Sequence, residues 1–296
     1  MNNFNWSFLR ELVRQPACAI GLLILLLIII AAIAAPWLYP GDPWRMVGAP
    51  NLPPFSPGYL FGTDILGRDV AAGIVHGSRV SLLIGVVATL VAVLVGTVLG
   101  AFAGYYGGRI DDIIMRFTEI FQTIPSFLLA LLLVAIFSPS VYSIVLAIAI
   151  VSWPSVTRLV RAEFMSIRTR DFVKAAVVGG QSGARIVFSQ ILPNALSPIV
   201  VVSSLMVATA ILLESAISFL GLGDRNMVSW GFMIGAGRTM IRQNWWLSAI
   251  PGIAIFITVL ALNFIGDGLN HALNPRSARK RTTVAASPAA QVKDVT

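Results

Sequence analysis

The most apolar stretch of the sequence is Ile20-Gly21-Leu22-Leu23-Ile24-Leu25-Leu26-Leu27-Ile28-Ile29-Ile30, the centre of an apolar run over residues 17–38. About 20 apolar residues cross the hydrocarbon layer of a membrane as one α-helix. A secretory signal peptide is the alternative, because Ala32-Ile33-Ala34 imitates a cleavage site. The run is longer than the apolar part of such a signal, and Pro36-Trp37 follow it like an anchor at the membrane surface. We therefore predict a retained first transmembrane helix.

The composition of the whole chain agrees with that helix. Of the 296 residues 57% are hydrophobic and 11% charged, and the mean hydropathy is +0.84, whereas soluble domains carry roughly 25% charged residues. The net charge of +8 comes from basic residues between apolar runs, which indicates membrane orientation rather than nucleic-acid binding. Cys18 is the single cysteine and is interpreted as a small apolar filler. No Cys/His cluster suggests a metal site.

Five further apolar runs predict an all-α polytopic membrane protein with six transmembrane helices. In the second run Gly96, Gly100 and Gly104 recur at steps of four, which gives a face that lets another helix approach closely. Pro125 should kink the third run. The predicted spans cover residues 80–104, 117–137, 141–159, 198–220 and 247–268.

The segments between the spans divide the chain. Residues 39–78 are polar and rich in proline and glycine, residues 105–116 form a short turn, and residues 221–246 form a second polar loop. The predicted regions are an N-terminal tail (1–16), the first helix with its external loop (17–79), a five-helix core (80–270) and a C-terminal tail (271–296).

The loop over residues 158–196 is basic yet helical in pattern. Asp171 is placed to cap a helix through Val178, Gly179-Gly180 break that helix, and Ser182 is placed to cap a second one that stops at Pro193. We predict a helix-turn-helix outside the bilayer.

The basic residues also predict the orientation. With six spans, 15 of the 21 Lys and Arg residues lie on the side of the two termini and of the 158–196 loop, and six lie on the opposite side. Loops rich in Lys and Arg stay in the cytoplasm. We therefore expect a multi-pass protein with both termini cytoplasmic.

Catalytic chemistry has no sequence signature here. The chain lacks a Gly-x-x-x-x-Gly-Lys-Ser/Thr phosphate loop, a His-Glu-x-x-His motif and a Gly-x-Ser-x-Gly elbow. Three acidic residues lie within or at the ends of spans, where charge is costly and therefore a functional hypothesis. Glu119 and Asp267 can also reach interfacial water. Glu214 lies deep in the fifth span, where it either locks helices together or contacts substrate.

Two segments of the 158–196 loop are the most informative. Lys174-Ala175-Ala176-Val177-Val178-Gly179-Gly180 and the later Gln190-Ile191-Leu192-Pro193 resemble the EAA signature of permease subunits of ATP-binding-cassette (ABC) importers. The resemblance implies that this loop docks on an ATPase subunit as a coupling helix, through Lys174, Ala175, Ala176, Gly180, Leu192 and Pro193. Lys174 stands where the family has glutamate, and Gln190 where it has isoleucine.

The resemblance extends along nearly the whole chain. Phe61-Gly62-Thr63-Asp64-Ile65-Leu66-Gly67-Arg68-Asp69-Val70 is similar to the external entrance motif of dipeptide, oligopeptide and nickel permeases. Ser218-Phe219-Leu220-Gly221-Leu222-Gly223 and Asn263-Phe264-Ile265-Gly266-Asp267-Gly268 are similar to the ends of their last two helices. Together the fragments resemble the DppC/OppC-type subunit. The charged residues Asp64, Arg68 and Asp69 either pair locally, fixing a short interfacial helix, or contact a partner. The entrance motif residues are Gly62, Thr63, Asp64, Gly67, Arg68 and Asp69.

The resemblance implies a type I ABC importer fold, a bacterial cytoplasmic (inner) membrane location and a set of partners. These are a second, different permease, two ATPase subunits that use ATP and Mg, and an external substrate-binding protein. This chain would bind no cofactor or metal and would be no enzyme. Peptides are the expected cargo, with nickel complexes, glutathione or opine-like solutes as alternatives. A channel or scaffold without ATP coupling is the alternative of another class, and a membrane-embedded enzyme is a third.

Overall fold

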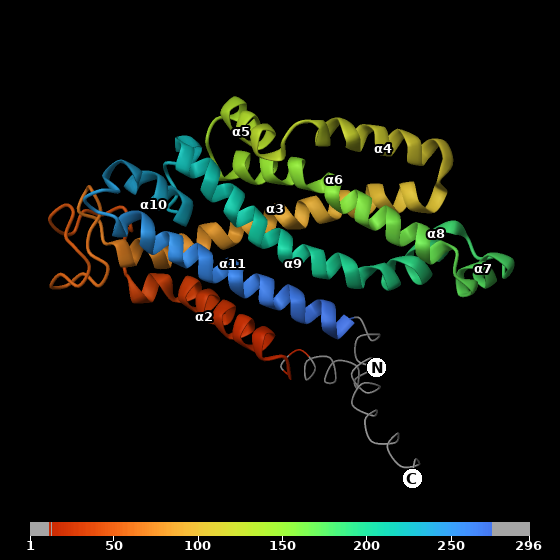
Figure 1. The fold of residues 1–296 in the computed structure, drawn as a ribbon, viewed down its shortest axis with the longest axis horizontal. Helices are drawn as coiled ribbons and strands as arrows, with labels where there is room; N and C mark the ends of the chain where they lie inside the picture. Colours follow the sequence, from red (N-terminus) through yellow and green to blue (C-terminus); the bar gives the residue numbers. More distant parts are fainter. Residues whose placement is uncertain (1–11, 13, 274–296) are drawn as a thin grey trace, which may run out of the picture.

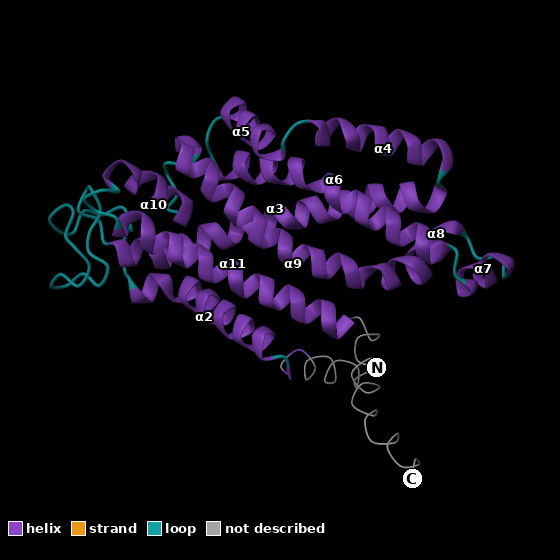
Figure 2. Cartoon of the chain, in the orientation of Figure 1, coloured by secondary structure: helices purple, strands orange, loops and turns teal. Residues whose placement is uncertain are grey.

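The computed structural model describes residues 12 and 14–273, and these fold into long helices that run side by side (Figure 1). Figure 2 shows helices and loops in this part of the chain and no strand arrows. Five helices are long and apolar enough to cross a membrane, or six if one bent pair counts as a span. The prediction of an all-helical membrane fold is confirmed. The α-helices are α2 (Pro16–Leu38), α3 (Val70–Tyr106), α4 (Gly108–Thr123), α5 (Ser126–Phe137), α6 (Val141–Arg168), α7 (Asp171–Val178), α8 (Gly183–Ile186), α9 (Leu192–Ile217), α10 (Trp230–Gly237) and α11 (Trp246–Leu273).

Helix α3 is the centre of the bundle, and its glycines explain how closely α6 packs against it. A Cβ atom added at Gly96 would lie 2.5 Å from Val156 Cβ, and one added at Gly104 would lie 2.6 Å from Phe164 Cβ. The predicted close-packing face is therefore confirmed, because a larger side chain there would force the two helices apart. On the other side of the bundle Cys18 of α2 is fully buried, and a Cβ at Gly268 of α11 would meet its sulfur at 2.3 Å. Cys18 fills space between the two helices, as predicted.

Helix α3 begins ten residues earlier than predicted. We expected the second span to start near Val80, but the helix starts at Val70 and has 37 residues. Asp69 is the N-cap, and its carboxylate accepts a hydrogen bond of 2.8 Å from the Ala71 amide. The cap satisfies a free N–H group at the helix start, so helix formation begins at the end of the external segment even though the first turns contain polar residues.

The third span was predicted from residue 117 with a kink at Pro125; the interruption does lie at Pro125, but it is a break between two helices and no mere kink. Helices α4 and α5 are separate and meet at an angle of 82°. Pro125 lies at their junction, where it lacks the N–H group that a continuous helix needs. Helix α4 also starts at Gly108, so most of the predicted 105–116 turn is helical. The reversal from α3 is confined to Gly107 and Gly108, which both have positive φ.

The predicted helix-turn-helix needs three corrections. Helix α6 continues to Arg168, beyond the expected end at residue 159. Asp171 is the first residue of α7, not its cap, and its side chain lies 3.5 Å from Lys174 Nζ. Pro193 does not stop a helix. A π-helical turn, η1 (Val187–Ile191), joins α8 to α9, so that residues 183–222 form one helical unit. The proline is tolerated because it lies in the first turn after the wider π turn.

The second predicted loop, 221–246, is also partly helical. A π turn η2 (Ser218–Leu222) ends the α9 unit, and the eight-residue α10 and a 3-10 turn η3 (Arg238–Met240) follow. Trp230, the first residue of α10, is almost completely buried. The segment therefore folds back onto the bundle at the end opposite α7 (Figure 1).

Candidate functional site

At one end of the bundle α7 projects beyond the long helices (Figure 1). Its inner face is anchored, because Val173 and Ala176 are buried in a cluster with Phe164, Ile167 and Ile186. The rest of its surface is exposed: Asp171 and Lys174 lie opposite the buried residues, together with Val178, which is 89% exposed. Phe172 and Val177, on either side of the buried residues, are exposed as well. Exposed apolar side chains on a helix that projects beyond the bundle indicate a surface that a partner covers.

The turn after α7 has the geometry of a Schellman motif. Gly180 has φ +71, its amide donates to Val177 O at 3.0 Å, and the Gln181 amide donates to Ala176 O at 3.1 Å. Two carbonyl groups at the helix end are thereby satisfied, and glycine adopts the left-handed conformation without cost from a side chain. A Cβ at Gly180 would meet nothing within 4 Å. The turn is therefore held by backbone hydrogen bonds and stands open on its outer side.

The remaining residues of the coupling prediction divide between the surface and the bundle. Lys174 and Ala175 are exposed on α7. Leu192 is partly buried in the same cluster as Ala176, and Pro193 is exposed one residue further along α9. An open cleft between the end of α3 and α7 is lined by Tyr105, Tyr106, Arg168, Val173, Lys174, Val177 and Val178.

At the opposite end, the entrance segment 62–69 folds tightly against the loop that precedes it. Gly62 and Gly67 have φ of +75 and +77, and added Cβ atoms would lie 2.1 Å from Leu52 O and 2.2 Å from Gly48 O. Thr63 is fully buried, and its hydroxyl donates to Ala49 O at 2.5 Å and accepts from the Leu52 amide at 3.0 Å. Only glycine fits the two positions, because there is no room for a side chain and φ is positive.

The charged side chains of the entrance segment bind groups within the segment and at the start of α3. Asp64 accepts hydrogen bonds of 2.8 Å from the amides of Leu66 and Arg68, and its carboxylate lies 4.0 Å from the Arg68 guanidinium. Asp69 caps α3. Burial raises the pKa of Asp69, and hydrogen bonds from backbone amides oppose that shift. The residues interact locally, as one of the two alternatives predicted, but they form turns and isolated bridges and no short interfacial helix.

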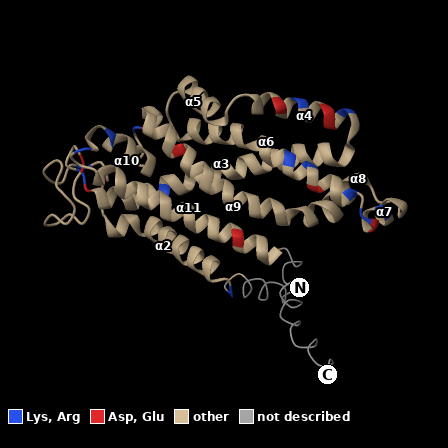
Figure 3. Ribbon diagram, in the orientation of Figure 1, with Lys and Arg blue, Asp and Glu red and all other residues tan. Residues whose placement is uncertain are grey.

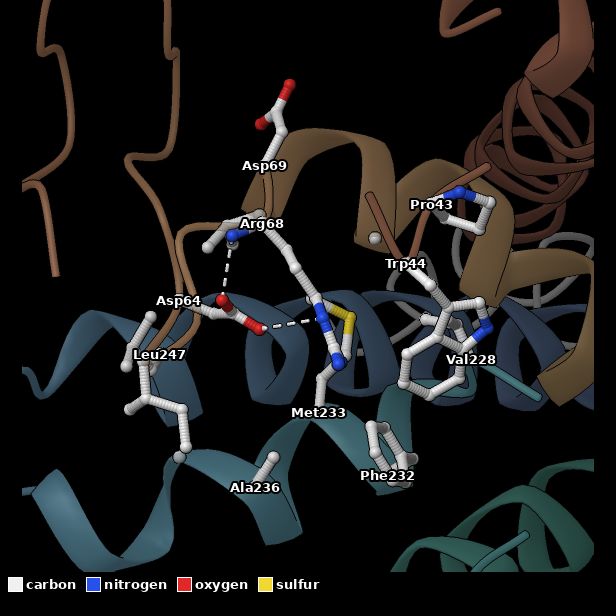
Figure 4. A pocket seen from close by; sticks show the side chains of 14 residues that line it. Pro43, Trp44, Asp64, Arg68, Asp69, Val228, Phe232, Met233, Ala236 and Leu247 are labelled. Carbon is white, nitrogen blue, oxygen red and sulfur yellow. Dashed lines mark hydrogen bonds and ion pairs between the residues drawn. The ribbon is translucent and has the colours of Figure 1, made fainter. Parts of the chain in front are cut away.

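A small cleft separates this segment from α10, and Figure 4 shows the side chains that line it. The Arg68 guanidinium stacks on the Trp44 ring at 4.5 Å, and Met233 and Phe232 of α10 face them. Trp44 also meets Phe232 edge to face at 5.2 Å. The loop that precedes α3 and α10 are therefore in contact through aromatic and cation–π packing.

Glu214 is buried between α9 and α10, 1% exposed. Its carboxylate accepts hydrogen bonds from Ser229 at 2.7 Å and from Ser218 at 2.8 Å, and Ser215 Oγ lies at 3.4 Å. Ser229 is also the N-cap of α10 and accepts from the Phe232 amide. Glu214 therefore fixes the start of α10 onto α9, as the locking alternative predicted. The three salt bridges of the described residues do not include Glu214.

Two features escaped the sequence analysis. Trp230 donates from its indole to Ile74 O at 2.9 Å, and its amide donates to Ser81 Oγ at 3.1 Å, which ties α10 to α3. Arg161 of α6 makes two hydrogen bonds of 2.5 Å to the carboxylate of Asp111 in α4. No local pattern reveals contacts between residues 50 or more positions apart. The other two charged candidates, Glu119 and Asp267, are exposed.

Comparisons with known proteins cover almost the whole chain. Residues 96–279 match the family model of the binding-protein-dependent transport system inner membrane component, and residues 4–54 match the N-terminal TM domain of oligopeptide transport permease C. The di/tripeptide transport system permease protein DppC of Pseudomonas aeruginosa (strain UCBPP-PA14) is 41% identical over 263 residues, 86% of this chain and 87% of that protein. The oligopeptide transport system permease protein OppC of Escherichia coli (strain K12) is 41% identical over 272 residues, 90% of this chain and 89% of that one.

Solved structures share the fold. A chain of the MetNI methionine ABC transporter in an inward-facing conformation aligns with a TM-score of 0.58 and 18% identity, over 68% of this chain and 96% of that chain. A chain of an amino acid ABC transporter aligns with a TM-score of 0.54 and 17% identity, over 68% of this chain and 94% of the other. At these identities the alignments show a common architecture and nothing about cargo.

Proposed function

This chain belongs to the family of binding-protein-dependent transport system inner membrane components, and from that premise we propose that it is the permease subunit of an ABC importer for di- and oligopeptides. The peptide cargo is supported by the two relatives, which are named as di/tripeptide and oligopeptide permeases. The proposed location is a bacterial cytoplasmic membrane, with both termini and α7 on the cytoplasmic side. The excess of Lys and Arg on that side supports the orientation.

The observation that carries the proposal is the outer face of α7. A short helix that is anchored on one side, exposes apolar and charged side chains elsewhere and projects beyond the bundle is suited to a partner with a complementary groove. An importer requires an ATPase subunit at that place. We propose that two ATPase subunits, using ATP and Mg, engage this chain and a second permease, while an external binding protein delivers the peptide to the opposite end.

The helix connections offer a route for force. Residues 183–222 form one helical unit that begins next to α7 and ends at η2, beside α10. A packed helix moves as a rigid element, so a push on α7 and α8 displaces the outer end of α9 as well. Glu214, near that end, carries the displacement to α10 through Ser229. Closure of the ATPase dimer would thus alter the external end of the translocation path.

Co-purification tests the proposal. The chain is expressed with its genomic neighbours and captured through a tag at its C-terminal end, and the retained ATPase is quantified for wild type and for Gly180→Trp. We expect the wild type to retain an ATPase and the variant to lose it without unfolding, because position 180 faces open space outside the bilayer. Peptide uptake should fall in parallel.

Gly58→Trp is the matched control. Gly58 also has positive φ and nothing within 4 Å of an added Cβ, but it lies in the external loop. It should retain the ATPase, since it imposes a similar backbone cost at the other end. If the wild type never retains an ATPase, a channel or scaffold replaces the importer. If Gly180→Trp retains it and transports normally, α7 is not the coupling element.

A further inference from the structure

Helix α4 has three distinct faces, and one of them is buried against its own chain. The packed face carries the buried residues Asp111 and Thr118. A second face is apolar and exposed, and its residues follow helical spacing: Ile110, Ile113, Phe117, Ile120 and Ile124. The third face is charged and exposed, with Arg109, Asp112, Arg116 and Glu119 in alternating sign. In Figure 3 these charges appear as alternating blue and red along α4.

The charged face reaches the middle of the bundle. Phe117 stacks on Trp153 at 5.7 Å, and Phe121 meets the same ring edge to face at 5.3 Å. Trp153 is the thirteenth residue of the 28 in α6, so it lies near the midpoint of a membrane span. Glu119 lies between the two phenylalanines in sequence and therefore at a similar depth. Helix α4 runs alongside α6 instead of across it, which excludes a helix lying flat on the membrane surface (Figure 1).

The charge of Glu119, at that depth, cannot face lipid. A charged side chain at the membrane centre is costly, and such residues face protein or a water-filled cavity. Arg109, Asp112 and Arg116 continue the same face toward the end where Asp111 pairs with Arg161. Within the described residues, the salt bridges do not include any of these four residues. The apolar face of α4 is the one suited to lipid or to an apolar partner, and the charged face is suited to water or a polar partner.

The break between α4 and α5 is a second, independent feature that needs water or protein around it. Residues 122–126 are all exposed, and Ile124 has an extended backbone. The last carbonyl groups of α4 lose their helical donors there, because Pro125 has no N–H and the chain turns by 82°. Non-helical backbone at membrane depth is tolerated only where protein buries it or where it lines a wet cavity. The end of a broken helix near the midplane is also a place where transporters bind charged substrate groups.

We infer that the charged face of α4, from Arg109 to Glu119, together with the exposed break at 122–126, lines the aqueous translocation path and contacts a zwitterionic peptide in transit. Glu119 and the negative, C-terminal end of the α4 dipole receive the peptide ammonium group. Arg116, one turn away, receives the carboxylate. The identification of the ligand as a peptide rests on the proposed function. The inference that α4 lines an aqueous path does not.

Thiol accessibility tests the path in the assembled transporter. Cys18, the only cysteine, is replaced by alanine, and single cysteines are introduced by Arg116→Cys, Glu119→Cys and Thr123→Cys. The matched controls on the apolar face are Phe117→Cys and Ile120→Cys, at the same depth. Membranes carrying the complete complex react with a charged, membrane-impermeant thiol reagent from the cytoplasmic side, with and without a dipeptide.

We expect cysteines at positions 116, 119 and 123 to react at least about tenfold faster than those at the two control positions. Only the thiolate reacts, and each unit by which apolar surroundings raise the thiol pKa lowers the thiolate fraction about tenfold. The dipeptide should slow labelling at 116 and 119. Equal rates on both faces, or no labelling at 116 and 119, would overturn the path. In the second case the face is packed dry against another subunit.

A substrate comparison tests the ligand separately. Glu119→Gln should reduce the preference for a dipeptide with a free amino group over its N-acetylated form by about tenfold, the usual effect of losing one charge-assisted hydrogen bond. An unchanged preference, or labelling that the dipeptide never slows, overturns the peptide contact. ATPase retention in the same preparations shows whether the importer itself is intact, so failure of the contact and failure of the proposed function are distinguishable.

Discussion

The two ends of the molecule differ in how far their own chain packs them. At one end, the entrance segment and α10 are held by their own chain, through the buried Thr63 hydroxyl, the Glu214–Ser229 hydrogen bond and the indole of Trp230. At the α7 end, one face of a two-turn helix is anchored, and exposed apolar and charged side chains cover the rest of it. The proposed function assigns that exposed surface to a partner.

Two glycines illustrate the difference in packing between the two ends. Gly62 and Gly180 have almost the same φ, +75 and +71. Around Gly62 backbone carbonyls stand 2.1 Å from where a Cβ would be, and around Gly180 there is nothing within 4 Å. One conformation thus serves two purposes: it lets loops interlock around the entrance segment, and it ends a protruding helix at the α7 end. Substitutions at the two ends test this contrast through the stability of the subunit.

Gly62→Ala should give the largest effect. We expect the free energy of unfolding in detergent to fall by about 3 kcal/mol or more, since alanine pays about 1–2 kcal/mol for left-handed backbone and must also displace a carbonyl group. Gly180→Ala is the control and should lose only about 1–2 kcal/mol. Thermal unfolding of the purified subunits measures both. Equal losses at the two positions would mean that the ends do not differ in packing.

Glu214→Ala should rank next, with a loss of about 2–3 kcal/mol, because it leaves buried Ser218 and Ser229 hydroxyls without their acceptor. Glu214→Gln keeps an acceptor oxygen and should lose about 1 kcal/mol or less. The same unfolding measurement applies, and uptake should follow stability. A glutamine variant as damaged as the alanine variant would show that the negative charge itself pairs with a cation.

Val178→Ser should give the smallest effect on the subunit alone, within about 0.5 kcal/mol, because the residue is 89% exposed. Its effect should appear in ATPase retention, which we expect to fall at least about threefold from the loss of apolar contact area. Val173→Ser is the matched control from the buried face of α7 and should destabilise the subunit itself. If Val178→Ser leaves ATPase retention unchanged, the outer face of α7 is not the docking surface.

Residue patterns predicted the parts of this fold that depend on near neighbours. The apolar run over 17–38 became α2, the Gly96–Gly100–Gly104 face packs on α6, and Gly179-Gly180 end α7. Helix boundaries were less accurate where polar residues continue a helix, as at 70–79 of α3 and 160–168 of α6. Pro125 did break its helix, but the local pattern gave no hint that the break reaches 82°. Pro193 predicts a helix end that the structure does not show, because a π turn that accommodates proline has no clear sequence signature.

Composition and spacings of a few residues predict that this chain is embedded in a membrane, that it forms apolar helices of membrane length and which family motifs it carries. These features are local, because lipid forces every backbone group to be satisfied within its own helix. The pairing of distant groups depends on the tertiary structure: Glu214 with Ser229, Arg161 with Asp111, Trp230 with Ile74. Such pairs join residues on different helices, and the way that helices rotate and cross is set by side-chain packing over the whole bundle.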